Sequence, residues 1–241
     1  MHRGIKLACQ YSYRPFSLRL CGPESQEAVK FMINYLLGEI KSEAKVKKIL
    51  KKFAGAFAYY QLIAQANKIK DPFNKKVVEA YWKGNQLLEK IKPADLKTLI
   101  FSKFSGPGLM TREKALQKIK SLPKQVKPQH SFHVLYLGSV TGRVNLRGKL
   151  IDICRISWGQ VKKVKKDKFE VVYQPLILKR KPHLGRVIRK EIDYEPNFAG
   201  KIKKGDWVSF HWNLVCEKLN EQDIKNLKKY TELNLKYAKR R

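Results

Sequence analysis

Apolar residues recur at helical spacing through the first half of the chain. The pattern predicts a helix that begins at Pro23 and a long helix from Ser42 to Asn67. Shorter helices are predicted to begin at Pro93 and Thr111, residues that suit the first turn or the cap of a helix. The sequence therefore predicts an all-helical domain over residues 1–125.

The residues before the first predicted helix have a different character. The segment Tyr11-Ser-Tyr-Arg-Pro-Phe is rich in aromatic side chains and is stiffened by Pro15, and Gly22-Pro23 stops it. We expect this segment to form an ordered arm that packs on the helical domain.

The apolar period changes from helical toward two after His130. Short apolar runs separated by glycine or Lys-Asp turns predict strands from there to Tyr173, and again over Val187–Ile192 and Trp207–Val215. Several short strands within about 85 residues indicate a small closed barrel of the OB or SH3-like size.

The end of the chain predicts a helix, because Asn220 is followed by the acidic residues Glu221 and Asp223, as at a helix N-cap. The expected fold class is therefore α+β: an N-terminal all-helical domain, a basic linker with prolines, and a small OB-like β-barrel with a C-terminal helix over residues 130–241.

The composition adds a strong positive charge. The 241 residues include 52 Lys and Arg against 20 Asp and Glu, a formal net charge of +32. This excess favours polyanionic partners such as nucleic acid or acidic protein surfaces. Lysine, spread along the chain, provides most of it, which is typical of a solvated surface.

Neither a membrane-spanning segment nor disulfide bonds are expected. No apolar run approaches the roughly 18 residues of a membrane span, and the N-terminus lacks a signal-peptide core, so we expect a cytoplasmic protein without a membrane partner. Cys9, Cys21, Cys154 and Cys216 are too few and too scattered for a disulfide framework, so we expect reduced thiols.

The sequence shows no nucleotide-binding motif with the required spacing. Gly138 to Lys149 superficially resembles a phosphate loop, but its glycine spacing is wrong and Leu150 replaces the needed Ser or Thr. His130 and His133 are expected to form a polar edge where the two domains meet, because metal binding would need further ligands close in space. By composition alone Cys154 and His211 would be core residues.

Two segments resemble the signatures of one known family. The segment Gly205-Asp-Trp-Val-Ser-Phe-His-Trp-Asn-Leu-Val-Cys-Glu-Lys-Leu-Asn-Glu resembles the pattern G-D-[YW]-V-x-[VF]-H-x-G-[FL]-A-x-x-x-[LI]-[DN]-E of the HypC/HupF-type hydrogenase formation chaperones. The segment Cys154-Arg-Ile-Ser-Trp-Gly-Gln-Val is similar to the C-[LV]-[AG]-I-P-G-[KQ]-V start of those proteins. The whole chain also resembles an uncharacterised bacterial family with a helical front half.

The resemblance to the chaperones implies an OB-like barrel that handles the iron cyanide carbonyl unit of nickel-iron hydrogenase together with an iron-scaffold partner. By position, Cys154 would bind iron transiently through its thiolate, and His211 would lie near it as a hydrogen-bond or proton partner. No other cofactor is expected. Further binding-surface candidates are Trp158, Gly159, Trp207, Trp212 and Asn213.

Three functions remain open at this stage. The preferred one is an accessory, chaperone-like protein, not an enzyme, which binds a maturation factor or a metalloenzyme precursor. The alternative is a basic OB-like nucleic-acid-binding protein, whose lysines contact phosphate while Trp158, Trp207, Trp212 or Tyr173 stack on bases. A hydrolase or transferase with a Cys154–His211 pair ranks third, because no third residue that would orient the pair is evident.

Overall fold

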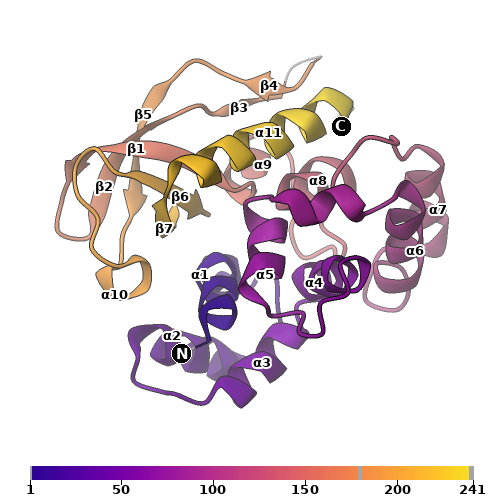
Figure 1. Ribbon diagram of the computed structural model, residues 1–241, viewed down its shortest axis with the longest axis horizontal. Helices are drawn as coiled ribbons and strands as arrows, with labels where there is room; N and C mark the ends of the chain where they lie inside the picture. The colour runs from indigo at the N-terminus through magenta and orange to yellow at the C-terminus, as the bar shows by residue number, and fades with distance from the viewer. Residues whose placement is uncertain (1, 179–180, 239–241) are drawn as a thin grey trace.

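The protein is α+β, as expected. The computed structural model describes residues 2–178 and 181–238, and Figure 1 shows helices on one side, a barrel on the other and a long helix that runs along the barrel toward the C-terminus. No helix in these residues is both long and apolar enough to cross a membrane.

Eight helical segments precede residue 125 in the described chain: α1 (Arg3–Ser17), α2 (Gln26–Leu37), α3 (Glu43–Lys51), α4 (Ala54–Ala66), α5 (Lys75–Trp82), the 3-10 helix η1 (Gln86–Lys90), α6 (Pro93–Lys103) and α7 (Arg112–Lys120). Two predicted starts are confirmed, because Pro93 is the first residue of α6 and Thr111 caps α7. The helix predicted from Pro23 begins instead at Gln26, since the Ser25 hydroxyl accepts a hydrogen bond from the Ala28 N–H at 3.1 Å. The long helix predicted over residues 42–67 is two helices, α3 and α4.

The first segment is not an arm but the helix α1, so that prediction was wrong. Ile5, Ala8 and Tyr11 on this helix are fully buried, and α1 contacts α2, α3 and α5 on one side and β6 and β7 on the other. Pro15 lies within the last turn of α1. A proline there removes one backbone hydrogen bond near the helix end, which the extensive burial of α1 tolerates.

The strands predicted between residues 130 and 154 are also wrong. The segment α8 (His130–Phe132) continues into the π-helical turn η2 (His133–Leu137), and α9 (Lys149–Cys154) follows after a loop. Gln129 caps the N-terminus of α8, because its side chain accepts a hydrogen bond from the Ser131 N–H at 2.9 Å. Short apolar runs do not distinguish a strand from a buried helical turn, and here the helical turn is stabilised by tertiary packing.

The barrel begins at residue 157 and closes on itself. Its strands are β1 (Ser157–Val164), β2 (Lys168–Tyr173), β5 (Ile188–Asp193), β6 (Trp207–His211) and β7 (Leu214–Leu219). They pair in the order β1-β2-β5-β7-β6, with β6 antiparallel to β1 and only β5 and β7 parallel, an arrangement of the OB type. The short strands β3 (Leu176–Ile177) and β4 (His183–Leu184) form a separate two-stranded sheet, and the helix α10 (Pro196–Ala199) contacts β7 of the barrel.

The stretch predicted as one strand, Trp207–Val215, is a hairpin. Trp212 and Asn213 have φ values of +50° and +61°, so the chain turns between β6 and β7 in the left-handed region. The predicted terminal helix is confirmed as α11 (Glu221–Tyr237), where the Asn220 side chain and the Asp223 carboxylate cap each other's backbone N–H groups.

The helical part and the barrel share one hydrophobic core. The cluster that contains the buried faces of α1, α4 and α5 also contains Trp158 and Leu214 of the barrel and Leu227 and Tyr230 of α11. The interior of the barrel forms a separate cluster around Phe169. The domain boundaries expected at residues 125 and 130 stay a prediction.

Candidate functional site

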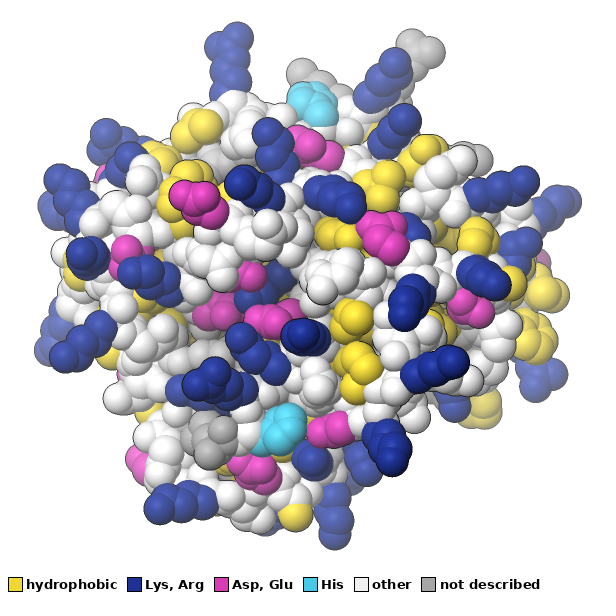
Figure 2. Space-filling model, viewed as in Figure 1, with side chains coloured by type: hydrophobic (Ala, Val, Ile, Leu, Met, Phe, Trp, Pro, Cys, Tyr) yellow, Lys and Arg dark blue, Asp and Glu magenta, His cyan; other side chains and the backbone are white. Residues whose placement is uncertain are grey.

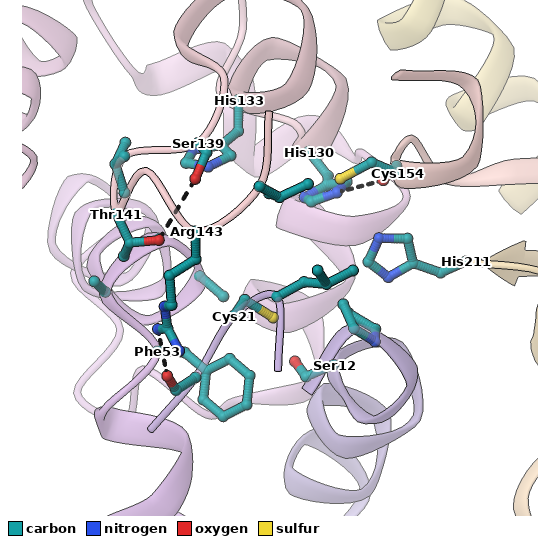
Figure 3. A pocket seen from close by; sticks show the side chains of 18 of the residues that line it. Ser12, Cys21, Phe53, His130, His133, Ser139, Thr141, Arg143, Cys154 and His211 are labelled. Atoms are coloured by element: carbon teal, nitrogen blue, oxygen red, sulfur yellow. Dashed lines mark hydrogen bonds between the residues drawn. The ribbon is translucent and has the colours of Figure 1, made fainter. Parts of the chain in front are cut away.

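Three buried side chains with metal-ligating atoms meet where the helices join the barrel. His130 begins α8, Cys154 ends α9 and His211 ends β6, and one ligating atom of each lies within 4.8 Å of the other two. Figure 3 shows these three residues together at one end of a pocket. The structure thus places Cys154 beside His211 and adds His130, which the sequence had placed at a polar edge.

The tautomer of His211 is fixed by a backbone carbonyl that a proline leaves free. Pro15 has no N–H, so the carbonyl of Tyr11, four residues earlier in α1, lacks its usual helical donor. His211 Nδ1 lies 2.7 Å from that carbonyl oxygen. Because a carbonyl only accepts, Nδ1 must carry the proton and Nε2 must carry a lone pair.

The other nitrogen of His211 is available to a ligand. His211 is 3 % exposed, and its Nε2 is buried and makes no hydrogen bond to any described residue. A backbone carbonyl on one ring nitrogen and a lone pair on the other is the usual arrangement of a metal-binding histidine. The orphaned atom therefore fits a metal ligand.

His130 is more constrained than His211. Its Nε2 lies 2.9 Å from the Cys154 carbonyl and therefore donates, which leaves Nδ1 to accept from the Tyr81 hydroxyl at 2.9 Å. His130 thus fixes the end of α9, and so the position of the Cys154 thiol. It can become a ligand only if the Tyr81 hydroxyl turns away.

Burial sets the protonation states of all three residues. It raises the pKa of the Cys154 thiol above its usual value, although the Trp212 indole N–H beside the sulfur opposes the effect. It lowers the pKa of His211 to about 4, against the opposing backbone groups of Tyr11 and Cys154. Burial and the neighbouring histidines lower the pKa of His130 well below its usual value. Both imidazoles are therefore neutral at pH 7, and a bound cation would displace the thiol proton.

The donor set suits a transition metal. A thiolate with one or two imidazoles is a soft to borderline set, which fits iron or zinc better than magnesium or calcium. The residues that would hold the metal are Cys154 and His211, and His130 would join them only after the Tyr81 hydroxyl turns away.

These residues line one end of a cavity of about 90 Å³. The opposite wall comes from the segment between η2 and α9, with Ser139, Thr141 and Arg143, and Cys21 lies on a third side (Figure 3). Burial raises the pKa of the Cys21 thiol to about 12, with Arg143 opposing it.

The remaining predicted site residues lie in different environments. Trp212 is 9 % exposed and lines the cavity, and Asn213 follows it in the hairpin turn. Trp158 is equally buried, and Gly159 packs so closely on β2 that a Cβ there would lie 2.6 Å from the Val172 carbonyl oxygen. Trp207, at 36 %, is the exposed tryptophan of this set.

One protein family, described as "Family of unknown function (DUF6390)", matches residues 1–241. The chain belongs to this family. The expectation of an uncharacterised family is therefore confirmed. No curated protein and no solved structure matches the chain. The resemblance to HypC/HupF-type chaperones rests on the two sequence motifs, and the function that it implies stays a proposal for this DUF6390 member.

Sequence reasoning missed two parts of the site. His130 was seen, but its segment was predicted to be a strand, which would not have brought it to Cys154. The contribution of Tyr11 was not seen, although Pro15 within a helix signals a free carbonyl four residues earlier.

Proposed function

We propose that this protein is an accessory protein of metalloenzyme maturation that binds a transition metal ion, iron as cargo, through Cys154 and His211. The observation that carries the proposal is the buried, unpartnered Nε2 of His211 in one cluster with the Cys154 thiol. The two residues occupy the positions that the chaperone motifs assign to them: His211 ends a strand of a barrel with the OB arrangement, and Cys154 ends the helix just before that barrel.

Metal transfer from this site requires a protein partner. His130 and His211 are 6 % and 3 % exposed and Cys154 is 9 % exposed, so the ion cannot exchange freely with solvent. A partner that docks at the junction between the helices and the barrel would have to open the cavity. The net charge of +32 favours a maturation factor or enzyme precursor with an acidic surface.

The structure does not favour nucleic acid as the main partner. Three of the four proposed stacking residues, Trp158, Trp212 and Tyr173, are 9 %, 9 % and 5 % exposed. Base stacking needs accessible ring faces. Figure 2 also shows lysines and arginines spread over the visible face with acidic side chains between them, not gathered in one strip.

Metal binding tests the proposal directly. The full-length protein is purified without oxygen and titrated with Fe²⁺, and with Co²⁺ as an optical probe. We expect about one ion per chain, with a thiolate-to-cobalt absorption band, and we expect Cys154→Ala to abolish the band. Cys9→Ala is the matched control, because Cys9 is a buried thiol of α1 that does not line the cavity.

His211→Ala should weaken metal binding at least tenfold. Candidate maturation proteins are then co-purified with the wild type and with Cys154→Ala, and the amounts retained by the two are compared to test for a partner. If Cys154→Ala and His211→Ala bind iron and cobalt as the wild type does, the metal-handling function must be abandoned.

A further inference from the structure

The cavity contains more unpartnered polar groups than the metal ligands explain. Besides His211 Nε2, whose lone pair serves the metal, two buried donor atoms that line it make no hydrogen bond to any residue in the described ranges: Ser12 Oγ and Arg143 Nη1. Ser12 and His211 are 2 % and 3 % exposed. Buried polar groups normally have partners, so a concentration of orphans in one cavity indicates a missing ligand.

The chemistry of these groups selects the ligand. Arg143 Nη1 can only donate, and the Ser12 hydroxyl can donate as well, while the Trp212 indole N–H in the same wall already lies beside the Cys154 sulfur. Among the cavity-lining residues that the structure describes, none is Asp or Glu, and Arg143 carries a permanent positive charge. A ligand that accepts hydrogen bonds and carries negative charge satisfies this surface.

Arg143 is positioned for such a ligand. Its Nη2 donates to the Gly22 carbonyl, which fixes the guanidinium against the wall of the cavity (Figure 3). Its Nη1 is 3.7 Å from a carboxylate oxygen of Glu24, a side chain that is 78 % exposed. This long, solvated ion pair leaves the donor capacity of Nη1 for a closer partner.

Two hydroxyl groups lie on the same segment as Arg143. Ser139 Oγ and Thr141 Oγ1 are 3.5 Å apart, at the limit of a hydrogen bond, so each keeps capacity for another partner. The segment is the one that superficially resembles a phosphate loop. Its contribution here is an arginine and two hydroxyls, not a nest of backbone N–H groups.

We propose that this cavity is a binding site for a small monovalent anion, of the size of formate or nitrate, with Arg143 as its charged partner. The volume of about 90 Å³ accommodates such an anion and excludes nucleotides and aromatic acids. The proposal goes beyond the proposed function, because the N–H and hydroxyl groups bind the anion whether or not a metal is present. With a metal at Cys154 and His211, the anion would lie in the same cavity as the ion.

Anion binding is measured on the full-length, metal-free protein in a chloride-free gluconate buffer at constant ionic strength. Sodium formate and sodium nitrate are titrated, with sodium benzoate as an anion too large for the cavity. We expect a saturable rise in Tm of about 5–10 °C at a hundredfold excess over Kd for the two small anions, and none for benzoate.

Two variants and one NMR spectrum test whether the anion binds in this cavity. Arg143→Gln should weaken binding at least tenfold. Arg147→Gln, an exposed arginine of the same segment, should leave Kd within twofold. Should Arg143→Gln fold poorly, the wild type still gives a result, because the Trp212 indole ¹⁵N–¹H signal should shift with the same Kd.

The results separate this proposal from the proposed function. No saturable effect of either small anion, equal binding by Arg143→Gln and the wild type, or an unmoved Trp212 signal overturns the anion site, even if iron binds. Arg143-dependent anion binding together with unchanged metal binding by Cys154→Ala would support the anion site and overturn the metal function.

Discussion

Replacing Lys83 with methionine tests the ion cluster that ties the helices to the barrel. The Lys83 side chain at the end of α5 is 3 % exposed, and its Nζ lies 3.3 Å from Glu79 in the same helix. The same Nζ lies 3.2 Å from Glu217 in β7 and 2.9 Å from Asp223 in the first turn of α11. One buried ammonium group therefore connects three elements.

The expected loss is large because methionine leaves three carboxylates facing one another. Removal of one partner from a buried ion cluster costs about 3–5 kcal/mol of unfolding free energy. For a protein of this size that corresponds to a decrease in Tm of about 6–20 °C. Lys75→Met is the matched control, because Lys75 also lies 3.3 Å from Glu79 but is 51 % exposed. We expect it to cost less than about 1 kcal/mol.

The destabilisation caused by Lys83→Met should become smaller as the pH falls. Burial lowers the pKa of Lys83, but the carboxylates of Glu217, Asp223 and Glu79 raise it above its usual value, so its stabilisation persists until strongly alkaline pH. Burial raises the pKa of Glu217, while Lys83 and the Tyr11 hydroxyl oppose that rise. Without Lys83 the pKa of Glu217 rises further, so Glu217 takes up a proton more readily as the pH falls.

Thermal unfolding between pH 8 and pH 5, followed by circular dichroism, measures the effect. The Tm difference between the wild type and Lys83→Met should be largest at pH 8 and should narrow toward pH 5. The double variant Lys83→Met/Glu217→Gln should recover part of the loss, because it removes a carboxylate that has lost its counter-ion. If Lys83→Met loses no more than Lys75→Met, or if the difference does not change with pH, the reasoning is refuted.

Two further changes test particular contacts. Pro15→Ala gives residue 15 an N–H that competes for the Tyr11 carbonyl, so ¹⁵N NMR should show His211 as a mixture of tautomers, and an unchanged spectrum would contradict the assigned role of the proline. Gly159→Ala places a Cβ 2.6 Å from the Val172 carbonyl oxygen, so we expect chemical denaturation to show a loss of about 1–3 kcal/mol, and a loss near zero would mean that β2 moves freely.

The parts of the fold that the sequence predicted correctly are set by local chemistry. Pro93, Thr111 and Asn220 start helices through contacts within one turn, so their effect is visible without tertiary structure. The barrel class followed from short strands of suitable number and length. Its closure, in which β6 returns to pair with β1, is a long-range outcome that no local pattern specifies.

The errors arose where tertiary contacts outweigh the local pattern. The segment after His130 alternates apolar and polar residues for a few positions, but it is short and buried, and it adopts α8 and the π-helical turn. The hairpin turn at Trp212 and Asn213 was missed because it contains no glycine, although asparagine tolerates the left-handed conformation.

The candidate site exists only when the two parts of the chain are packed together. The motif pair indicated that Cys154 and His211 belong together, but the tautomer that leaves a lone pair on His211 Nε2 is set by Tyr11, a residue of the first helix. His130, from the connecting segment, then fixes the end of α9. The barrel alone would therefore carry His211 without the group that orients it. The helical part thus orients His211 directly, and the Lys83 cluster joins that part to β7 and α11.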